Sequence, residues 1–115
     1  FHCALMAPAQ ETLQWDLWNP LFCELAMPLI TNVDAEPIEA AEEARDALIR
    51  QVTAPVQWER SMRELLRRGV THFVEVGPGR VLSGLMRRID RAAVCCNVED
   101  AASLEKALTT LKAVA

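Results

Sequence analysis

The most constraining feature of this sequence is a strand, a glycine-rich turn and a helix that follow one another between residues 71 and 90. Residues 71–76 are largely apolar or β-branched, which is typical of a short strand. Gly77-Pro78-Gly79 comes next, and this combination predicts a sharp turn. Residues 81–90 then predict a helix. A strand that turns directly into a helix is a building unit of layered α/β folds.

The rest of the chain continues this alternation. The spacing of apolar residues predicts further helices over residues 5–18, 38–52, 56–68 and 101–114, and further strands over residues 27–33 and 92–98. Pro55 and Gly69 are placed to end two of the helices. Strands that alternate with helices indicate an α/β fold in which the strands pair in parallel.

The length of 115 residues suits one domain or part of one. A parallel sheet needs helices on both faces, and its edge strands need neighbours. The three predicted strands and five predicted helices make a poor α/β domain by themselves. We therefore expect a further segment, from another chain or from an absent N-terminal part, to complete the fold.

The composition excludes several classes of function. The net charge of −4 argues against a general nucleic-acid surface. The sequence contains no apolar run of about eighteen residues and no visible signal peptide, so we expect no membrane association. The four cysteines lack Cys-x-x-Cys spacing and are typical of small buried apolar residues. This pattern predicts a reducing, cytoplasmic compartment, with neither a metal site nor disulfides.

His2 precedes the first predicted helix. The N-terminus of a helix has a partial positive charge, which disfavours a cation there and favours a neutral imidazole. A general base must be neutral, so His2 is a candidate for that role. Taken without further context, the residues favour the simpler interpretation that His2 is a frayed terminal residue with no chemical task.

Several segments resemble one enzyme family in the order of its motifs. The first segment, Phe1-His2-Cys3-Ala4-Leu5-Met6-Ala7-Pro8-Ala9, resembles the histidine motif of malonyl-CoA:acyl carrier protein transacylases. The later ones are Ile30-Thr31-Asn32-Val33-Asp34, Asp46-Ala47-Leu48-Ile49-Arg50-Gln51, Pro55-Val56-Gln57-Trp58 and Val74-Glu75-Val76-Gly77-Pro78-Gly79-Arg80-Val81-Leu82-Ser83-Gly84-Leu85. The resemblance implies that residues 1–115 are the C-terminal segment of an acyltransferase domain. It also implies the C-terminal part of the large α/β-hydrolase-like subdomain, with short parallel strands flanked by helices.

The resemblance also implies an activity, which is malonyl transfer from coenzyme A to the phosphopantetheine thiol of acyl carrier protein in fatty-acid biosynthesis. His2 is expected to be the general base and acid, and the backbone carbonyl of Gln51 is expected to hold its imidazole. Helix ends leave carbonyls unpaired, and Pro55 cuts short the helix before it, which fits this role for Gln51. In related domains a Phe at the position of Phe1 goes with malonyl selectivity. No cofactor is implied beyond the substrate malonyl-CoA.

The family's nucleophile is a serine in a Gly-His-Ser-x-Gly turn, and this chain has no such motif. Its serines, Ser61, Ser83 and Ser103, all lie in predicted helices or their first turns. The family's arginine for the malonyl carboxylate and its Gly-Gln-Gly-Ser segment are also absent. The missing N-terminal segment is therefore an expected partner, and this chain alone is expected to be inactive.

Two features leave alternatives open. The Gly77-Pro78-Gly79 turn could be a generic anion cradle, although a tight structural turn is the favoured interpretation. Two arginine clusters could be solvated helix faces, or they could dock acidic acyl carrier protein or the phosphates of coenzyme A. They are Arg60, Arg63, Arg67 and Arg68, and Arg80, Arg87, Arg88 and Arg91. The alternative function is accordingly a non-catalytic α/β interaction fragment that binds an acidic partner such as acyl carrier protein.

Overall fold

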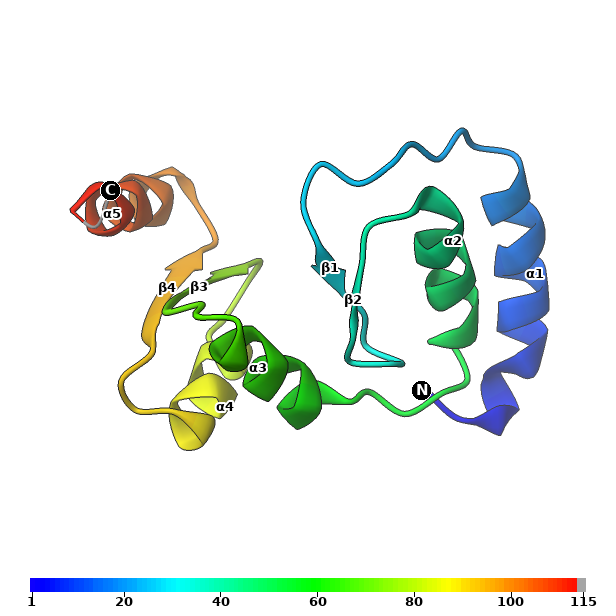
Figure 1. Cartoon of the computed structure of the whole chain (residues 1–115), viewed down its shortest axis with the longest axis horizontal. Helices are drawn as coiled ribbons and strands as arrows, with labels where there is room; N and C mark the ends of the chain where they lie inside the picture. Colours follow the sequence, from blue (N-terminus) through cyan, green and yellow to red (C-terminus); the bar gives the residue numbers. More distant parts are fainter. Residues whose placement is uncertain (114–115) are drawn as a thin grey trace. The chain divides into compact units, whose positions relative to one another are not determined.

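The computed structural model describes residues 1–113 (Figure 1). The chain forms two compact units, Phe1–Glu64 and a second unit from Leu65 onward. Each unit is described separately below. Val114, the last residue of the helix predicted over residues 101–114, lies outside the described residues.

The first unit is built around two helices, α1 (Ala7–Trp18) and α2 (Ala41–Arg50), which lie side by side (Figure 1). A short 3₁₀ turn, η1 (Ala4–Met6), leads into α1. The face of α2 that packs inward presents small side chains at helical spacing, namely the buried Ala41, Ala44 and Ala47. The predicted helix over residues 5–18 is confirmed, with its first turn in 3₁₀ form.

Residues 27–38 form a hairpin, which differs from the sequence prediction. Strand β1 (Leu29–Ile30) pairs antiparallel with β2 (Pro37–Ile38). The expected parallel pairing of the strand over residues 27–33 is therefore wrong, and α2 begins after a second strand instead of at residue 38. The reason is the short connection, because parallel neighbours need a crossover of a dozen or more residues. The turn between the strands is closed by the Ala35 N–H, which donates to the Thr31 carbonyl at 3.0 Å.

Helix α3 (Trp58–Arg67) follows Pro55 and ends close to the predicted position. Gly69 has a φ of +85°, the left-handed conformation that glycine adopts without steric cost. Its N–H donates to the Leu66 carbonyl at 2.9 Å, and the Val70 N–H donates to the Leu65 carbonyl at 3.1 Å. This pair of bonds is the Schellman arrangement, which satisfies carbonyls at the end of a helix.

The second unit contains a βαβ arrangement followed by a helix. Its elements are β3 (His72–Val76), α4 (Val81–Ile89), β4 (Val94–Val98) and α5 (Ala101–Lys112). Strands β3 and β4 pair in parallel, in register from His72 opposite Val94 onward. Helices α4 and α5 both contact β4. The predicted α/β class and the parallel pairing of these two strands are confirmed.

Large apolar side chains stay exposed in both units. In the first unit they include Phe1, Leu5, Trp15, Leu21 and Met27, and in the second Val76, Val81, Leu82, Leu104 and Leu108. The buried apolar residues are mostly alanines, together with Met62 and Met86. Residues 1–113 therefore leave extensive apolar surface uncovered. No helix in this described part is long and apolar enough to span a membrane.

Candidate functional site

His2 and Gln51 meet in the first unit. The Nδ1 atom of His2 lies 2.7 Å from the main-chain carbonyl oxygen of Gln51. A carbonyl oxygen can only accept a hydrogen bond, so Nδ1 must be the donor. A neutral ring that donates through Nδ1 has a lone pair on Nε2, because only one of the two nitrogens is then protonated. The site thus presents an imidazole in the tautomer that can accept a proton through Nε2.

Gln51 is placed by the end of α2. It is the C-cap residue of the helix, and its own N–H donates to the Ala47 carbonyl at 3.0 Å. The chain then turns, and the Ala54 N–H donates to the Arg50 carbonyl at 3.2 Å. The last carbonyls of a helix lack intrahelical partners, so the Gln51 oxygen is free to accept from outside the helix. The helix end therefore supplies a fixed acceptor for the imidazole.

The backbone of His2 is in the left-handed region, with a φ of 57°. Cys3 is extended, and η1 begins directly after it, with the Met6 N–H donating to the Cys3 carbonyl at 2.9 Å. Left-handed conformations are uncommon for residues other than glycine, and histidine is among the types that tolerate them best. The chain thus turns sharply at His2 before it enters the helix.

Two contacts join α1 to α2 and its following turn. The Thr53 hydroxyl donates to Gln10 Oε1 at 2.6 Å. Toward the other end of α1, Arg45 Nε donates to the Leu17 carbonyl at 3.1 Å. The guanidinium of Arg45 also lies 5.3 Å from the Trp18 ring centroid and 4.7 Å from that of Phe22, within cation–π range. Sequence analysis missed these contacts, and no spacing rule points to them, because their partners lie up to 43 residues apart.

A carboxylate pair fixes the hairpin turn to α2. Arg50 donates two hydrogen bonds to Asp34, at 2.9 and 2.7 Å, and a third to Asp46 at 2.6 Å. The hydrogen bonds from Arg50 hold the pKa of Asp34 below its ordinary value, although partial burial opposes this. The same contacts raise the pKa of Arg50. This ion cluster immediately precedes Gln51 and holds that part of α2 against the hairpin.

A cavity of about 290 Å³ adjoins Gln51. Its lining is mostly apolar and consists of Leu29, Ile30, Thr31, Asn32, Ala44, Ala47, Leu48 and Gln51. Asn32 Nδ2 donates to the side-chain oxygen of Gln51 at 3.4 Å. Phe1, the residue expected to influence selectivity, is 99% exposed. Its role in selectivity therefore stays a prediction.

The glycine turn of the second unit is occupied by the protein's own carboxylate. Glu75 accepts hydrogen bonds from the Leu82 N–H at 3.0 Å and from the Ser83 N–H and hydroxyl at 2.8 and 2.7 Å. It also accepts from Asn97 Nδ2 at 2.9 Å. Burial opposes ionisation of Glu75, yet these hydrogen bonds hold its pKa below the ordinary value. The first turn of α4 is already capped, which favours the structural turn over an anion cradle.

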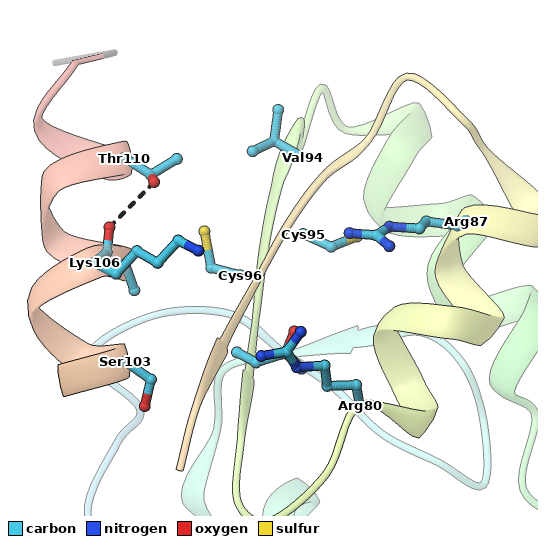
Figure 2. A pocket seen from close by; sticks show the side chains of 10 residues that line it. Arg80, Arg87, Val94, Cys95, Cys96, Ser103, Lys106 and Thr110 are labelled. Carbon is cyan, nitrogen blue, oxygen red and sulfur yellow. Dashed lines mark hydrogen bonds between the residues drawn. The ribbon is translucent and has the colours of Figure 1, made fainter. Parts of the chain in front are cut away.

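A second cavity, of about 220 Å³, lies beside β4 and brings three cations together (Figure 2). Arg80, Arg87 and Lys106 line it with Cys95 and Cys96. Cys95 points toward Arg87 and Cys96 toward Lys106, on opposite sides of the strand as its alternation predicts (Figure 2). Burial raises the pKa of the Cys95 thiol, although Arg87 opposes this. The cavity presents positive charge, and its thiols favour the protonated form.

The other cysteines differ from expectation. Cys3 and Cys23 are exposed, so the prediction that the cysteines are buried is wrong for this pair, although all four are free thiols. Both lie in poorly covered parts of the first unit. Among residues 1–113, no three His, Cys, Asp or Glu side chains are grouped so that they could hold a metal ion.

Comparison with known proteins identifies close relatives for nearly the whole chain. It is 42% identical over 108 residues to the malonyl CoA-acyl carrier protein transacylase of Salmonella typhimurium, covering 94% of this chain and 35% of the relative. It is 38% identical over 112 residues to the protein of the same name from Bacillus subtilis, covering 97% of this chain and 35% of the relative. No family model matches the sequence.

The structure gives the same result. A malonyl-transacylase solved in complex with its type II polyketide synthase acyl-carrier protein superimposes with a TM-score of 0.86 at 40% identity. The match covers 95% of this chain and 35% of that one. The resemblance inferred from the motifs is thereby confirmed. The chain spans about a third of the length of the curated relatives it matches.

Proposed function

Because this chain is homologous to part of the malonyl CoA-acyl carrier protein transacylases, we propose that it is one segment of such an enzyme. In this proposal, residues 1–115 are the C-terminal segment of the acyltransferase domain. The rest of the domain supplies the nucleophile and covers the apolar surface that residues 1–113 expose. The observation that supports the proposal most directly is the hydrogen bond between His2 and the Gln51 carbonyl.

The proposed reaction begins with a serine hydroxyl from the rest of the enzyme. Its oxygen attacks the carbonyl carbon of the malonyl thioester while His2 Nε2 accepts its proton. The tetrahedral intermediate collapses, the bond to sulfur breaks, and His2 returns the proton to the departing coenzyme A thiolate. A malonyl ester on the serine remains.

The second half of the reaction reverses these roles. His2 Nε2 takes the proton of the phosphopantetheine thiol of acyl carrier protein, and the sulfur attacks the malonyl ester. The ester bond to serine breaks, and the serine oxygen recovers the proton from His2. Both halves use a nucleophile and a single acid–base group, so this chemistry needs no cofactor beyond the substrate malonyl-CoA.

Gln51 replaces the carboxylate of a serine-type triad in this proposal. An orienting group must accept a hydrogen bond from Nδ1, so that Nε2 faces the nucleophile in the correct tautomer. A main-chain carbonyl provides this acceptor without adding a charge. Phe1 precedes the base directly, and its ring would exclude acyl groups with an additional methyl. Such steric discrimination amounts to about 1–3 kcal/mol.

The cationic cavity of the second unit supports a second candidate function. Arg80, Arg87 and Lys106 line one cavity, and acyl carrier protein is acidic. The chain would then be a non-catalytic interaction fragment that binds an acidic partner. The same surface is compatible with carrier docking by a complete enzyme, so the two candidates differ only in whether His2 performs chemistry.

The test is a chimaera in which this chain replaces the corresponding segment of the Salmonella relative. We expect the chimaera to transfer malonyl groups from malonyl-CoA to acyl carrier protein. His2→Ala should lower kcat roughly 10²–10⁴-fold, the range for loss of a general base. His72→Ala is the matched control, because His72 lies in β3 and its Nδ1 contacts the neighbouring Thr71 hydroxyl.

Two outcomes would reject the catalytic proposal. One is normal transfer by the His2→Ala chimaera. The other is a folded chimaera that binds acyl carrier protein but transfers nothing, which would favour the interaction fragment. Binding is measured separately by titration of the chain with the carrier, so that the two readouts are independent.

A further inference from the structure

We propose that Thr53 and Gln10 are positioning residues that keep His2 aligned with the Gln51 carbonyl. This inference rests on the proposed function, because alignment matters to catalysis only if His2 is the base. Thr53 and Gln10 form one hydrogen bond of 2.6 Å between the turn after α2 and the first part of α1.

The hydrogen bond of His2 needs additional support. It lies at an exposed position, and His2 is the second residue of the chain described here. An exposed hydrogen bond adds little net free energy, because water competes for both partners. Ordering a residue near a chain end costs conformational entropy of comparable size. The contact between His2 and Gln51 therefore depends on how well the elements on either side are fixed.

Thr53 is well placed to fix the acceptor. It lies two residues after Gln51, in the same turn that closes α2. A bond from Thr53 to α1 holds this turn, and with it the Gln51 carbonyl, against the helix that follows His2. The partly buried setting of the bond protects it from competition by water.

Gln10 fixes the donor. It lies in α1, and η1 joins α1 to His2 without a flexible interval. His2 is eight positions before Gln10, about 12 Å along a helical path at 1.5 Å per residue. Arg45 already clamps the opposite end of α1 through Leu17. Two separated clamps define the direction of a rod, whereas a single clamp lets its far end swing. Without Thr53, the end that bears His2 is the end free to move.

The experiment uses the same chimaera with Thr53→Val, which keeps the shape of the side chain and removes the hydroxyl. We expect kcat to fall about tenfold with KM unchanged, since misplacement of about 1 Å costs up to a hundredfold. Thr53→Ser restores the hydroxyl and should recover most of kcat. A Gln10→Met, Thr53→Val double variant should be no slower than the slower single variant, because both substitutions remove the same bond.

Thr12→Val is the matched control. Thr12 lies on α1, and its hydroxyl donates to the Pro8 carbonyl of the same helix at 3.1 Å, so it makes no bond to α2. A second readout avoids activity altogether. In ¹⁵N NMR spectra of the chimaera, the protonated Nδ1 and unprotonated Nε2 of His2 give distinct shifts. Thr53→Val should move them toward those of a free histidine, and Thr12→Val should not.

The inference is wrong if Thr53→Val leaves both kcat and the His2 signals unchanged. It is also wrong if Thr12→Val has the same effect, if Thr53→Ser fails to restore kcat, or if KM rises as kcat falls. These results differ from failure of the proposed function, in which His2→Ala itself leaves transfer unaffected. A chimaera that loses activity on His2→Ala but ignores Thr53→Val would reject only the positioning role.

Discussion

The His2 Nδ1 atom lies 2.7 Å from the Gln51 carbonyl oxygen, although the two residues are 49 positions apart in the sequence. The acceptor belongs to the main chain, so the identity of the side chain at position 51 contributes little to it. The geometry of the α2 C-terminus, rather than a particular residue type, provides the oxygen.

Substitution of Gln51 should accordingly be tolerated. Gln51→Ala keeps the carbonyl and removes only the long 3.4 Å contact with Asn32. In the chimaera we expect malonyl transfer within about threefold of the parent value, since an exposed neutral hydrogen bond contributes about 0.5–1.5 kcal/mol at most. A steady-state assay beside His2→Ala measures this. A loss as large as that of His2→Ala would show that the glutamine side chain, and not the main chain, performs the task.

Arg45 should contribute strongly to the stability of the first unit. Its side chain is only 12% exposed, and it contacts Leu17, Trp18 and Phe22. Arg45→Ala should lower the free energy of unfolding by about 2 kcal/mol, from lost cation–π contacts and one lost hydrogen bond. Urea denaturation followed by tryptophan fluorescence measures the change.

Arg63 is the comparison residue for Arg45. It pairs with Glu59 at 2.7 Å on α3, but both side chains are more than 60% exposed. Arg63→Ala should change the free energy of unfolding by no more than about 0.5 kcal/mol, because exposed pairs are screened by water. Equal effects of the two substitutions would contradict the importance assigned to the Arg45 contacts.

Glu75 should make stability depend on pH in the acidic range. Its pKa in the folded chain lies below its ordinary value of 4.5, since the hydrogen bonds from Ser83, Leu82 and Asn97 outweigh the effect of burial. A depressed carboxyl pKa contributes stability that is complete above the unfolded pKa and is lost as pH falls through the folded pKa. The melting temperature should therefore fall as pH decreases below about 4.5.

Glu75→Gln isolates this contribution. The variant should melt lower than the parent at neutral pH, because the charged acceptor at the first turn of α4 is gone. The difference between the two proteins should shrink as the pH is lowered, since protonation removes the same charge from the parent. Parallel thermal melts across this range test the assignment, and a constant difference at every pH would contradict it.

Two glycines should respond in opposite directions to alanine. Gly84 lies inside α4, and a Cβ added there meets no atom within 4 Å. Gly84→Ala should raise the free energy of unfolding by about 0.5–1 kcal/mol, because alanine has the higher helix propensity. Gly69 has a φ of +85°, so Gly69→Ala should lower it by about 1–2 kcal/mol. Chemical denaturation of both variants provides the comparison, and a shared sign would contradict the backbone argument.

Local chemistry made most of the helices and the βαβ unit predictable. Pro55 and Gly69 mark helix boundaries because proline lacks an N–H and glycine adopts left-handed angles without strain. The hairpin was not predictable in the same way. Strands of two residues, such as β2 (Pro37–Ile38), show no periodicity, and their pairing depends on the loop that joins them.

The contacts around the candidate site required the tertiary structure. The family resemblance nominated His2 and Gln51, but nothing in the sequence indicated that Thr53 meets Gln10 or that Arg45 lies against Trp18 and Phe22. These contacts depend on how α1 packs against α2. Similarly, Glu75 became a helix cap only because the turn after β3 brings α4 back onto it.

The sequence alone determined the types of element, most of their boundaries and the family motifs, because caps, turns and apolar periods act over a few residues. The tertiary structure alone decided which distant groups meet: an imidazole and a helix-end carbonyl, a hydroxyl and an amide, a guanidinium and two rings. Such meetings depend on the packing of whole helices, and hydrogen bonds tolerate errors of only a few tenths of an ångström. No local pattern specifies positions to that accuracy.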